Sequence, residues 1–122
     1  MSSKLSKKSN SQLLGTVQML ETVYASSQSA LWRDVARRLS SPRSNWAAVN
    51  LYKLQRFASD GETVLIPGKL LASGELTRKV TVAAYSTSKA AARKIEAAGS
   101  KLISIEELAT SNPKGSGVKI IV

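Results

Sequence analysis

The sequence contains no cysteine and no histidine, and it has only two aspartates, Asp34 and Asp60. The absence of cysteine excludes disulfides, thiolate nucleophiles and cysteine-ligated metals. The absence of histidine removes the side chain that most often serves as a general acid or base near neutral pH. Because the usual nucleophile–base constellations are missing, we predict a protein that is not an enzyme and that uses no metal, cofactor or small-molecule substrate.

Long hydrophobic runs are also missing. No apolar stretch approaches the roughly 18 residues that a membrane-spanning helix needs, and residues 1–11 form no basic-then-hydrophobic leader. With 43% hydrophobic and 21% charged residues, the chain of 122 residues has the composition of an ordinary globular protein. We therefore expect one hydrophobic core, no membrane partner and a cytoplasmic location.

Positive charge is the strongest feature that the sequence does have. Eighteen Lys and Arg residues are set against eight Asp and Glu residues, a net charge of +10. Residues 1–60 contain nine Lys and Arg residues and three acidic residues, a net charge of +6. Residues 61–122 contain nine Lys and Arg residues and five acidic residues, a net charge of +4. Such an excess favours a polyanionic partner, because neutralised phosphates release condensed counterions. The plainer alternative is a basic soluble protein with no such partner.

The first half of the chain predicts a basic arm followed by helices. Residues 1–9 carry Lys4, Lys7 and Lys8 among serines, with too little apolar surface to fold alone, so we expect a mobile arm that contacts the polyanion. Residues 10–122 are predicted to form a single α/β domain, with a helical half over 10–60 and a strand–helix half over 61–122. Apolar residues spaced three and four apart predict helices over about 10–24, 30–39 and 46–58.

The outer faces of these helices carry candidate anion contacts. Arg37 follows another arginine by four residues, and the pair is either a solvated helix face or an anion contact. Lys53 and Arg56 share a stripe with an aromatic residue on the third helix, and Arg43 lies just upstream. Lys and Arg bind phosphates, and an aromatic ring can stack on an unpaired base. We predict that Trp46 anchors the core, with such stacking as the alternative.

Residues 62–76, with the sequence ETVLIPGKLLASGEL, lie at the middle of the chain. The apolar run predicts a buried strand to residue 66, and the Pro-Gly pair that follows predicts a tight turn. Lys69 would lie at this turn and can bind a backbone phosphate. A phosphate-loop motif is excluded, because that motif requires two glycines five apart and then Lys with Ser or Thr. Positive charge returns at Arg78 and Lys79, which we include among the candidate contacts.

The remaining residues predict alternating strands and helices. Strands are expected over about 80–85, 101–103 and 118–122, and helices over about 89–98 and 105–110. Ser104 precedes Glu107 by the spacing of a capping box, which marks the start of the last helix. Strands separated by helices favour an α/β fold whose small sheet is mostly parallel.

Several segments, taken in order, resemble one family. The sequence is similar to the large-subunit ribosomal protein family of archaea and eukaryotes called L-eighteen-e, a relative of bacterial L-fifteen. The matching segments span almost the whole chain from residue 9 onward. They are Pro42-Arg43, residues 49–51, VLIPGKLL at 64–71, VTVAA at 80–84, STSKAAARKIEAAG at 86–99 and NPKGS at 112–116.

This resemblance implies a structural protein of the large ribosomal subunit that binds ribosomal RNA and supports its folding and assembly beside neighbouring ribosomal proteins. It also implies an α/β fold in which N-terminal helices precede an irregular β-β-α core. The matched motifs place Arg43, Asn50, Lys53 and Lys69 nearest the RNA. All candidate RNA contacts together are Lys4, Lys7, Lys8, Arg37, Arg43, Asn50, Lys53, Arg56, Lys69, Arg78 and Lys79.

Two other classes of protein remain as alternatives. A DNA-binding protein would use the helices at 30–58 as a helix-turn-helix and read base edges with one of them. An enzyme acting on phosphorylated substrates would need a pocket that gathers Lys69 with Glu62 or Glu75.

Overall fold

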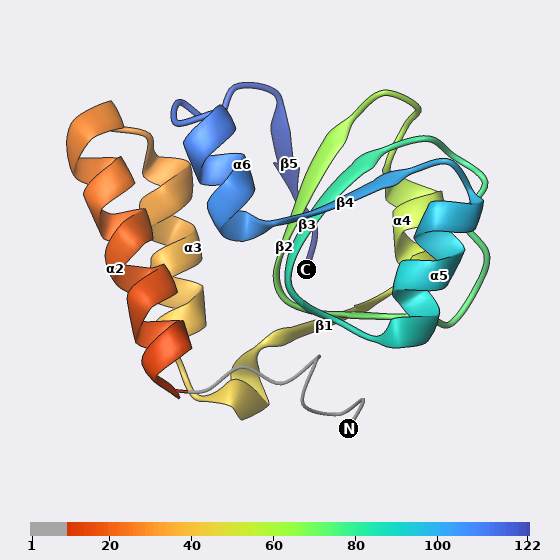
Figure 1. The fold of residues 1–122 in the computed structure, drawn as a ribbon, viewed down its shortest axis with the longest axis horizontal. Helices are drawn as coiled ribbons and strands as arrows, with labels where there is room; N and C mark the ends of the chain where they lie inside the picture. Colours follow the sequence, from red (N-terminus) through yellow and green to blue (C-terminus); the bar gives the residue numbers. More distant parts are fainter. Residues whose placement is uncertain (1–9) are drawn as a thin grey trace.

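The computed structural model describes residues 10–122 and arranges them in three layers, with a sheet between two groups of helices (Figure 1). One face of the sheet is covered by α2 (Asn10–Ser27), α3 (Ala30–Ser40) and α6 (Ile105–Ser111). The other face is covered by α4 (Leu51–Phe57) and α5 (Lys89–Ala97). The predicted α/β class with N-terminal helices is confirmed. Lys4, Lys7 and Lys8 lie outside the described residues.

The sheet consists, within residues 10–122, of β1 (Ala47–Asn50), β2 (Thr63–Leu71), β3 (Thr81–Thr87), β4 (Lys101–Ser104) and β5 (Val118–Ile120). The order is β1-β2-β3-β4, and β5 also pairs with β2. β1 pairs with the carboxyl end of β2, at 68–71, while β5 pairs with its amino end, at 63–65. All of these pairings are parallel, which confirms the predicted parallel sheet.

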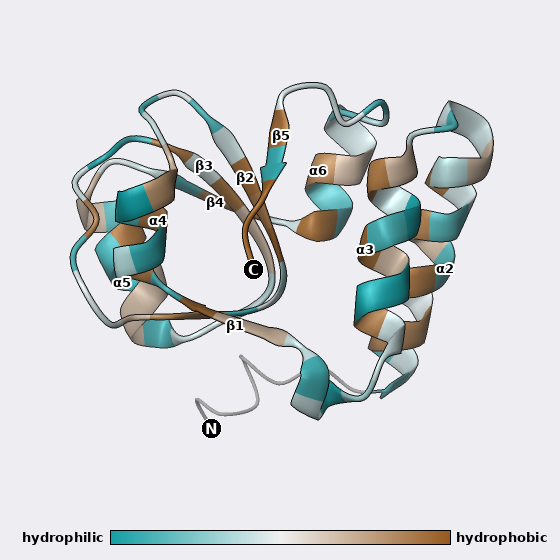
Figure 2. Cartoon of the chain, turned by 180° about the vertical axis from the view of Figure 1, so that it is seen from behind, coloured by the Kyte–Doolittle hydropathy of each residue, from teal (hydrophilic) through white to brown (hydrophobic). Residues whose placement is uncertain are grey.

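Two hydrophobic cores lie on the two faces of the sheet, because side chains alternate along each strand. Val64 and Ile66 of β2 face α4 and α5, while Leu65 faces the layer of α2, α3 and α6. In Figure 2, hydrophobic residues follow the inner strands and alternate with hydrophilic residues along the helices, as expected for amphipathic helices on a buried sheet. Each large side chain that is fully buried contributes about 1.5–3 kcal/mol, and Trp32 and Leu20 are among them.

The predicted tight turn after residue 66 is wrong, because β2 continues through Pro67 and Gly68 to Leu71. The pairing with β3 is irregular between Ile66 and Lys69, and a proline is tolerated in a strand at such a bulge. Gly68 serves a different purpose from the one expected. A Cβ there would lie 2.2 Å from the carbonyl oxygen of Ala47, so the close approach of β1 requires glycine.

The predicted helix over 46–58 is half wrong. Residues Arg43–Asn45 form a short 3₁₀ helix, η1, and Ala47–Asn50 form β1, so only Leu51–Phe57 are helical. Short apolar runs satisfy helix and strand patterns equally well, and here the free edge of β2 binds the segment as a strand. This strand separates α3 from α4 and replaces the helix-turn-helix that the DNA-binding alternative required over 30–58.

The other elements agree with the prediction to within three residues at each end. The cap at α6 is confirmed, since the Ser104 hydroxyl accepts a hydrogen bond of 3.0 Å from the backbone N–H of Glu107. Ser88 caps α5 in the same way, with a distance of 3.1 Å to the backbone nitrogen of Ala91. Local cap chemistry therefore sets where these two helices begin.

The close approach of β1 to β2 makes Gly68 the position most sensitive to an added methyl group. Gly68→Ala is expected to lower the free energy of unfolding by about 1–3 kcal/mol, because the backbone of Ala47 must move. Gly15→Ala is the matched control: it lies within α2 with no atom within 4 Å of an added Cβ, and should raise stability by about 0.5–1 kcal/mol. Urea unfolding of both variants measures the difference, and an equal effect at the two sites would contradict this account.

Candidate nucleic-acid interface

Cationic side chains gather where the carboxyl end of β2 meets the end of α3. A hollow of about 290 Å³ lies between these elements, and Arg38, Trp46 and Pro67 are among the residues that line it. Lys69 lies two residues beyond Pro67, opposite Ala48 of β1. We call Arg37, Arg38, Arg43 and Lys69 together the carboxyl-end surface. Ligands of open α/β folds bind at this end of the strands.

Trp46 holds Arg43 in place. The Arg43 guanidinium carbon lies 5.0 Å from the centroid of the indole ring, in cation–π geometry. Trp46 as a residue is 9% exposed, and its Nε1 donates a hydrogen bond of 3.0 Å to the carbonyl of Ser41. Its edge-to-face contact with Tyr85 has centroids 5.3 Å apart. Trp46 is therefore a core residue, as predicted, and not an exposed stacking position.

Two strands of the sheet, β2 and β3, contribute Lys69 and Tyr85 to the same region as Trp46. Leu70 is buried against α4 and α5, so alternation along β2 directs the exposed Lys69 to the side of the sheet that carries Trp46. Burial raises the pKa of the Tyr85 hydroxyl, and although Arg43 acts in the opposite direction, the phenol stays neutral at physiological pH. The positive charge of the corner thus comes from the arginines and Lys69.

Asp34 orients two of these arginines. Its Oδ1 lies 2.8 Å from Nη2 of Arg37 and its Oδ2 lies 3.0 Å from Nε of Arg38, one turn further along α3. Partial burial raises the pKa of Asp34, but the hydrogen bonds from Arg38 and Arg37 outweigh it, so the pKa lies below the ordinary value of 3.8. The carboxylate offsets one of the two positive charges, while the Arg37 side chain remains 80% exposed.

Two of the predicted contacts on and before α4 take part in structural hydrogen bonds. The side-chain oxygen of Asn50 accepts a hydrogen bond of 3.1 Å from the backbone N–H of Ser73, which ties β1 to the loop after β2. The ammonium group of Lys53 donates to the carbonyl oxygen of Val122. Asn50 and Lys53 are both half-buried. Sequence reasoning had no means of finding these partners, which lie 23 and 69 residues away.

The outer side of α4 is aromatic and cationic, as predicted. Tyr52 is 60% exposed, and the guanidinium of the exposed Arg56 lies 5.4 Å from the ring centroid of Phe57. Phe57 is itself a large exposed apolar side chain. These residues form a second surface, the α4 surface, defined here by Tyr52, Lys53, Arg56 and Phe57.

Arg78 and Lys79 lie at the opposite end of the sheet from Lys69. Arg78 donates a hydrogen bond to the carbonyl of Ala58, and the backbone N–H of Lys79 donates to Oδ1 of Asp60 at 2.8 Å. The carbonyl of Lys79 pairs with Gly61, just before the first residue of β2. At about 3.3 Å per residue, eight residues of strand separate the two ends by roughly 25 Å. The candidate contacts therefore do not form one cluster.

Sequence reasoning missed Arg38 as a member of the carboxyl-end surface. The adjacent Arg37-Arg38 pair in the last turn of α3, shortly before Pro42, was the available signal. Across residues 10–122, no group of three or more acidic, His or Cys side chains is placed to hold a metal ion. None of the described helices is both long enough and apolar enough to cross a membrane.

Comparison with known proteins identifies the family. Residues 48–103 match the family model that describes the ribosomal proteins 50S-L15 and 50S-L18e together with a 60S counterpart. Large ribosomal subunit protein eL18 of Picrophilus torridus is 48% identical over 121 residues, which are 99% of each chain. The eL18 proteins of Archaeoglobus fulgidus and Halobacterium salinarum are 44% and 43% identical, covering 95% and 93% of this chain and 99% and 97% of their own lengths.

The match to the family model shows that the chain is a ribosomal protein, and the similar eL18 proteins show which ribosomal protein family it is. The chain belongs to the eL18 family of large ribosomal subunit proteins. The predicted resemblance to the L-eighteen-e family is confirmed, and so is the prediction of a ribosomal protein of the cytoplasm rather than an enzyme.

The Asp34 pairs predict a pH-dependent contribution to stability. Asp34→Asn is expected to lower the free energy of unfolding at pH 7 by about 0.3–1 kcal/mol, the range for helix-surface ion pairs. Because the pKa of the folded state lies below 3.8, this contribution is present above pH 3.8 and is lost as the pH falls through the folded-state value.

Chemical denaturation of wild type and variant between pH 2 and pH 7 measures this difference. Glu96→Gln on α5 is the control, because Glu96 has no ion pair among the described residues. A difference for Asp34→Asn that stays constant down to pH 2 would show that the ion pairs contribute nothing.

Proposed function

We propose that this protein is a structural component of the large ribosomal subunit that binds ribosomal RNA directly and supports its folding and assembly. Membership of the eL18 family supports the ribosomal role. The observation that carries RNA binding is the carboxyl-end surface, where Arg43 is held over Trp46 and the exposed Lys69 lies opposite Ala48, two residues after Trp46. The net charge of +10 supports the same partner.

The carboxyl-end surface is suited to phosphate because its charges are held on rigid elements. A guanidinium stacked on a buried indole presents its edge in a fixed direction, and the N–H groups of such an edge can donate two parallel hydrogen bonds to one phosphate. Lys69 adds a point charge from a strand that is paired on both sides. Little side-chain entropy is lost on binding such preorganised groups, so more of the contact energy appears as affinity.

Recognition is proposed to rest on phosphate, sugar and shape. No helix-turn-helix spans residues 30–58, since β1 occupies its centre, and base-edge reading by an inserted helix is therefore not expected. Ribosomal RNA offers irregular helices and splayed bases, and Tyr52 of the α4 surface is exposed enough to stack on one of them. Lys53 and Arg56 would bind adjacent phosphates.

The remaining candidate contacts extend the proposed footprint. Arg78 and Lys79 would bind a second part of the RNA at the amino end of the sheet, about 25 Å from Lys69. The basic residues Lys4, Lys7 and Lys8 are proposed to contact RNA as well. Neighbouring ribosomal proteins would contact surfaces that the RNA leaves uncovered.

Removal of two carboxyl-end cations should weaken RNA binding and reduce its salt dependence. For Arg43→Gln combined with Lys69→Gln, the slope of log affinity against log salt should fall by about one unit for each phosphate that is no longer neutralised. Fluorescence anisotropy with transcripts of Picrophilus torridus large-subunit RNA measures this slope. Arg93→Gln combined with Lys114→Gln removes the same charge elsewhere and should change the slope much less. Equal changes of the slope in the two double variants would show that RNA affinity depends on net charge alone, and would contradict the proposed surface.

The ribosomal role makes a separate prediction. Incubated with salt-washed large subunits from an archaeon and centrifuged through sucrose at moderate salt, the protein should sediment with the subunits. Ribonuclease treatment should release it to the top of the gradient, because the contacts are to RNA. A protein that stays at the top without ribonuclease, or that sediments equally well after it, contradicts the proposal.

A further inference from the structure

The hollow of about 290 Å³ at the carboxyl-end surface lies where α3 ends and the chain turns into β1 (Figure 1). Its volume is close to the lower bound for small-molecule sites, roughly 300 Å³, so it has room for one flat heterocycle but not for a stretch of helix or strand. The residues that line it are Arg38, Ser41, Asn45, Trp46, Ala47 and Pro67. They combine apolar surface with hydrogen-bonding groups, and Arg38 is the only charged residue among these six.

Two polar side chains of this lining keep hydrogen-bonding capacity for a ligand. The side-chain amide of Asn45 forms no hydrogen bond within residues 10–122, so its N–H groups and its oxygen are both available there. Arg38 donates from Nε to Asp34, and the two Nη groups of its guanidinium have no acceptor within the same residues. Asp34 thus offsets part of the positive charge of Arg38 without using all of its donors. Such a lining suits a neutral group that both donates and accepts hydrogen bonds better than it suits a phosphate.

The apolar part of the lining comes from the two paired strands and the residue before β1. Pro67 of β2 is buried, Ala47 of β1 is half-buried, and Trp46 directly precedes Ala47. The side chains of proline and alanine offer no hydrogen bond, so this part of the hollow suits the apolar face of a ring. A planar heterocycle with a polar edge, which is the chemistry of a nucleobase, would use both parts of the lining.

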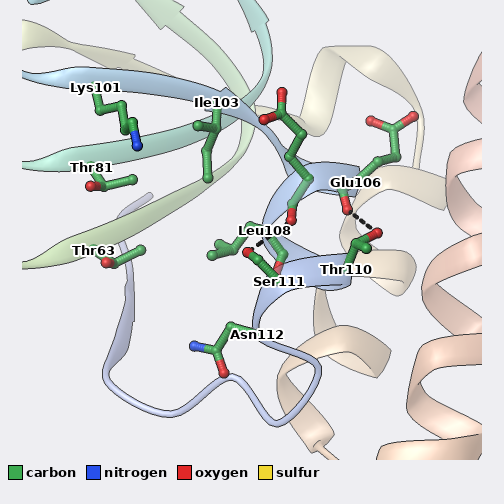
Figure 3. A pocket seen from close by; sticks show the side chains of 10 residues that line it. Thr63, Thr81, Lys101, Ile103, Glu106, Leu108, Thr110, Ser111 and Asn112 are labelled. Atoms are coloured by element: carbon green, nitrogen blue, oxygen red, sulfur yellow. Dashed lines mark hydrogen bonds between the residues drawn. The ribbon is translucent and has the colours of Figure 1, made fainter.

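Exposed cations around the hollow would hold the phosphates on either side of such a base. Arg37, Arg43 and Lys69 are all exposed, and they belong to the same carboxyl-end surface. The larger groove of about 670 Å³ between α6 and the amino ends of β2, β3 and β4 lacks this setting (Figure 3). Among the described residues that line it, two glutamates of α6 are set against a single cation, Lys101, so its charge disfavours phosphate.

We propose that this hollow receives one unpaired base of the bound RNA, an inference that rests on the proposed function and adds a base contact to it. The base would lie against Pro67 and Ala47 with its polar edge at Asn45 and Arg38, and its flanking phosphates would bind the exposed cations. Ribosomal RNA supplies bases that are already splayed out of its helices, so little pairing has to be broken for one of them to enter.

Chemical shifts of the isotopically labelled protein test the proposal with two RNA hexamers, one of mixed sequence with all four bases and one abasic chain with the same phosphates. The mixed hexamer should shift the amides of Asn45 and Ala47 and the indole N–H of Trp46, whereas the abasic chain should shift only amides near exposed cations such as Arg37. Equal shifts at the hollow from both hexamers would show a phosphate site and overturn the proposal.

The fate of the proposed function is read separately, by fluorescence anisotropy with large-subunit RNA transcripts. If neither hexamer shifts the signals of the hollow while the transcripts bind, base insertion is wrong and the proposed RNA binding stands. If the transcripts do not bind either, both are wrong.

Substitution of Asn45 tests whether the hollow contacts the base itself. Asn45→Ala should weaken binding of the mixed hexamer about three- to tenfold, the effect of losing one or two hydrogen bonds, and should leave the abasic chain unaffected. Ser44→Ala is the matched control, because Ser44 is the exposed neighbour in η1 and does not line the hollow; it should change either affinity less than twofold. Arg37→Gln removes a phosphate contact and should weaken both hexamers alike. Thermal unfolding verifies that the variants fold, and an Asn45→Ala variant that weakens both hexamers equally, or neither, would overturn the proposal.

Discussion

The parallel pairing of β1 with the carboxyl end of β2 is the contact on which the functional geometry depends. It requires a residue without a side chain at Gly68, because the carbonyl of Ala47 occupies the space that a Cβ would take. It brings η1 and Trp46 to the end of β2 that carries the exposed Lys69, and the Trp46 ring packs against the Arg43 guanidinium. A change at this backbone crossing would therefore move the cationic corner as well as destabilise the core, even though Gly68 itself offers no group to a ligand.

Much of the fold was accessible from the sequence, because local signals and tertiary packing agree over most of it. Ser88 and Ser104 cap helices where their spacing predicts, and strands separated by helices pair in parallel as expected. The errors fall where β1 meets β2. Pro67 and Gly68 are residues typical of a turn, but β2 continues through both. The irregular pairing with β3 tolerates Pro67, which has no backbone N–H to donate, and the close approach of β1 requires glycine at position 68. Residues 47–50 fit a helical period, and only the free edge of β2 decides that they form a strand.

The candidate site could be predicted as a set of residues but not as a surface. Arg43 and Lys69 are 26 positions apart (69 minus 43), and nothing local indicates that the register of β1 on β2 places them at one corner. Asn50 and Lys53 were predicted to contact nucleic acid. In the structure both also form hydrogen bonds to distant parts of the backbone, Asn50 with Ser73 and Lys53 with Val122. Arg38 was not predicted as an RNA contact, because its spacing from Asp34 indicated an ion pair within one helix. Its position at the hollow between α3 and β2 depends on tertiary structure. Residue type is readable from sequence; the juxtaposition of side chains depends on long-range pairing.

The double use of one edge of β2 has a consequence for synthesis on the ribosome. Residues 63–65 pair with 118–120, a separation of 55 positions (118 minus 63), whereas 68–71 pair with 47–50, which emerge earlier. During vectorial synthesis the carboxyl half of this edge can close first, and the amino half stays open until the last strand leaves the exit tunnel. A nascent chain of this protein consequently presents an incomplete sheet edge from the emergence of β2 until β5 follows it, which is the condition under which strands pair with the wrong neighbour.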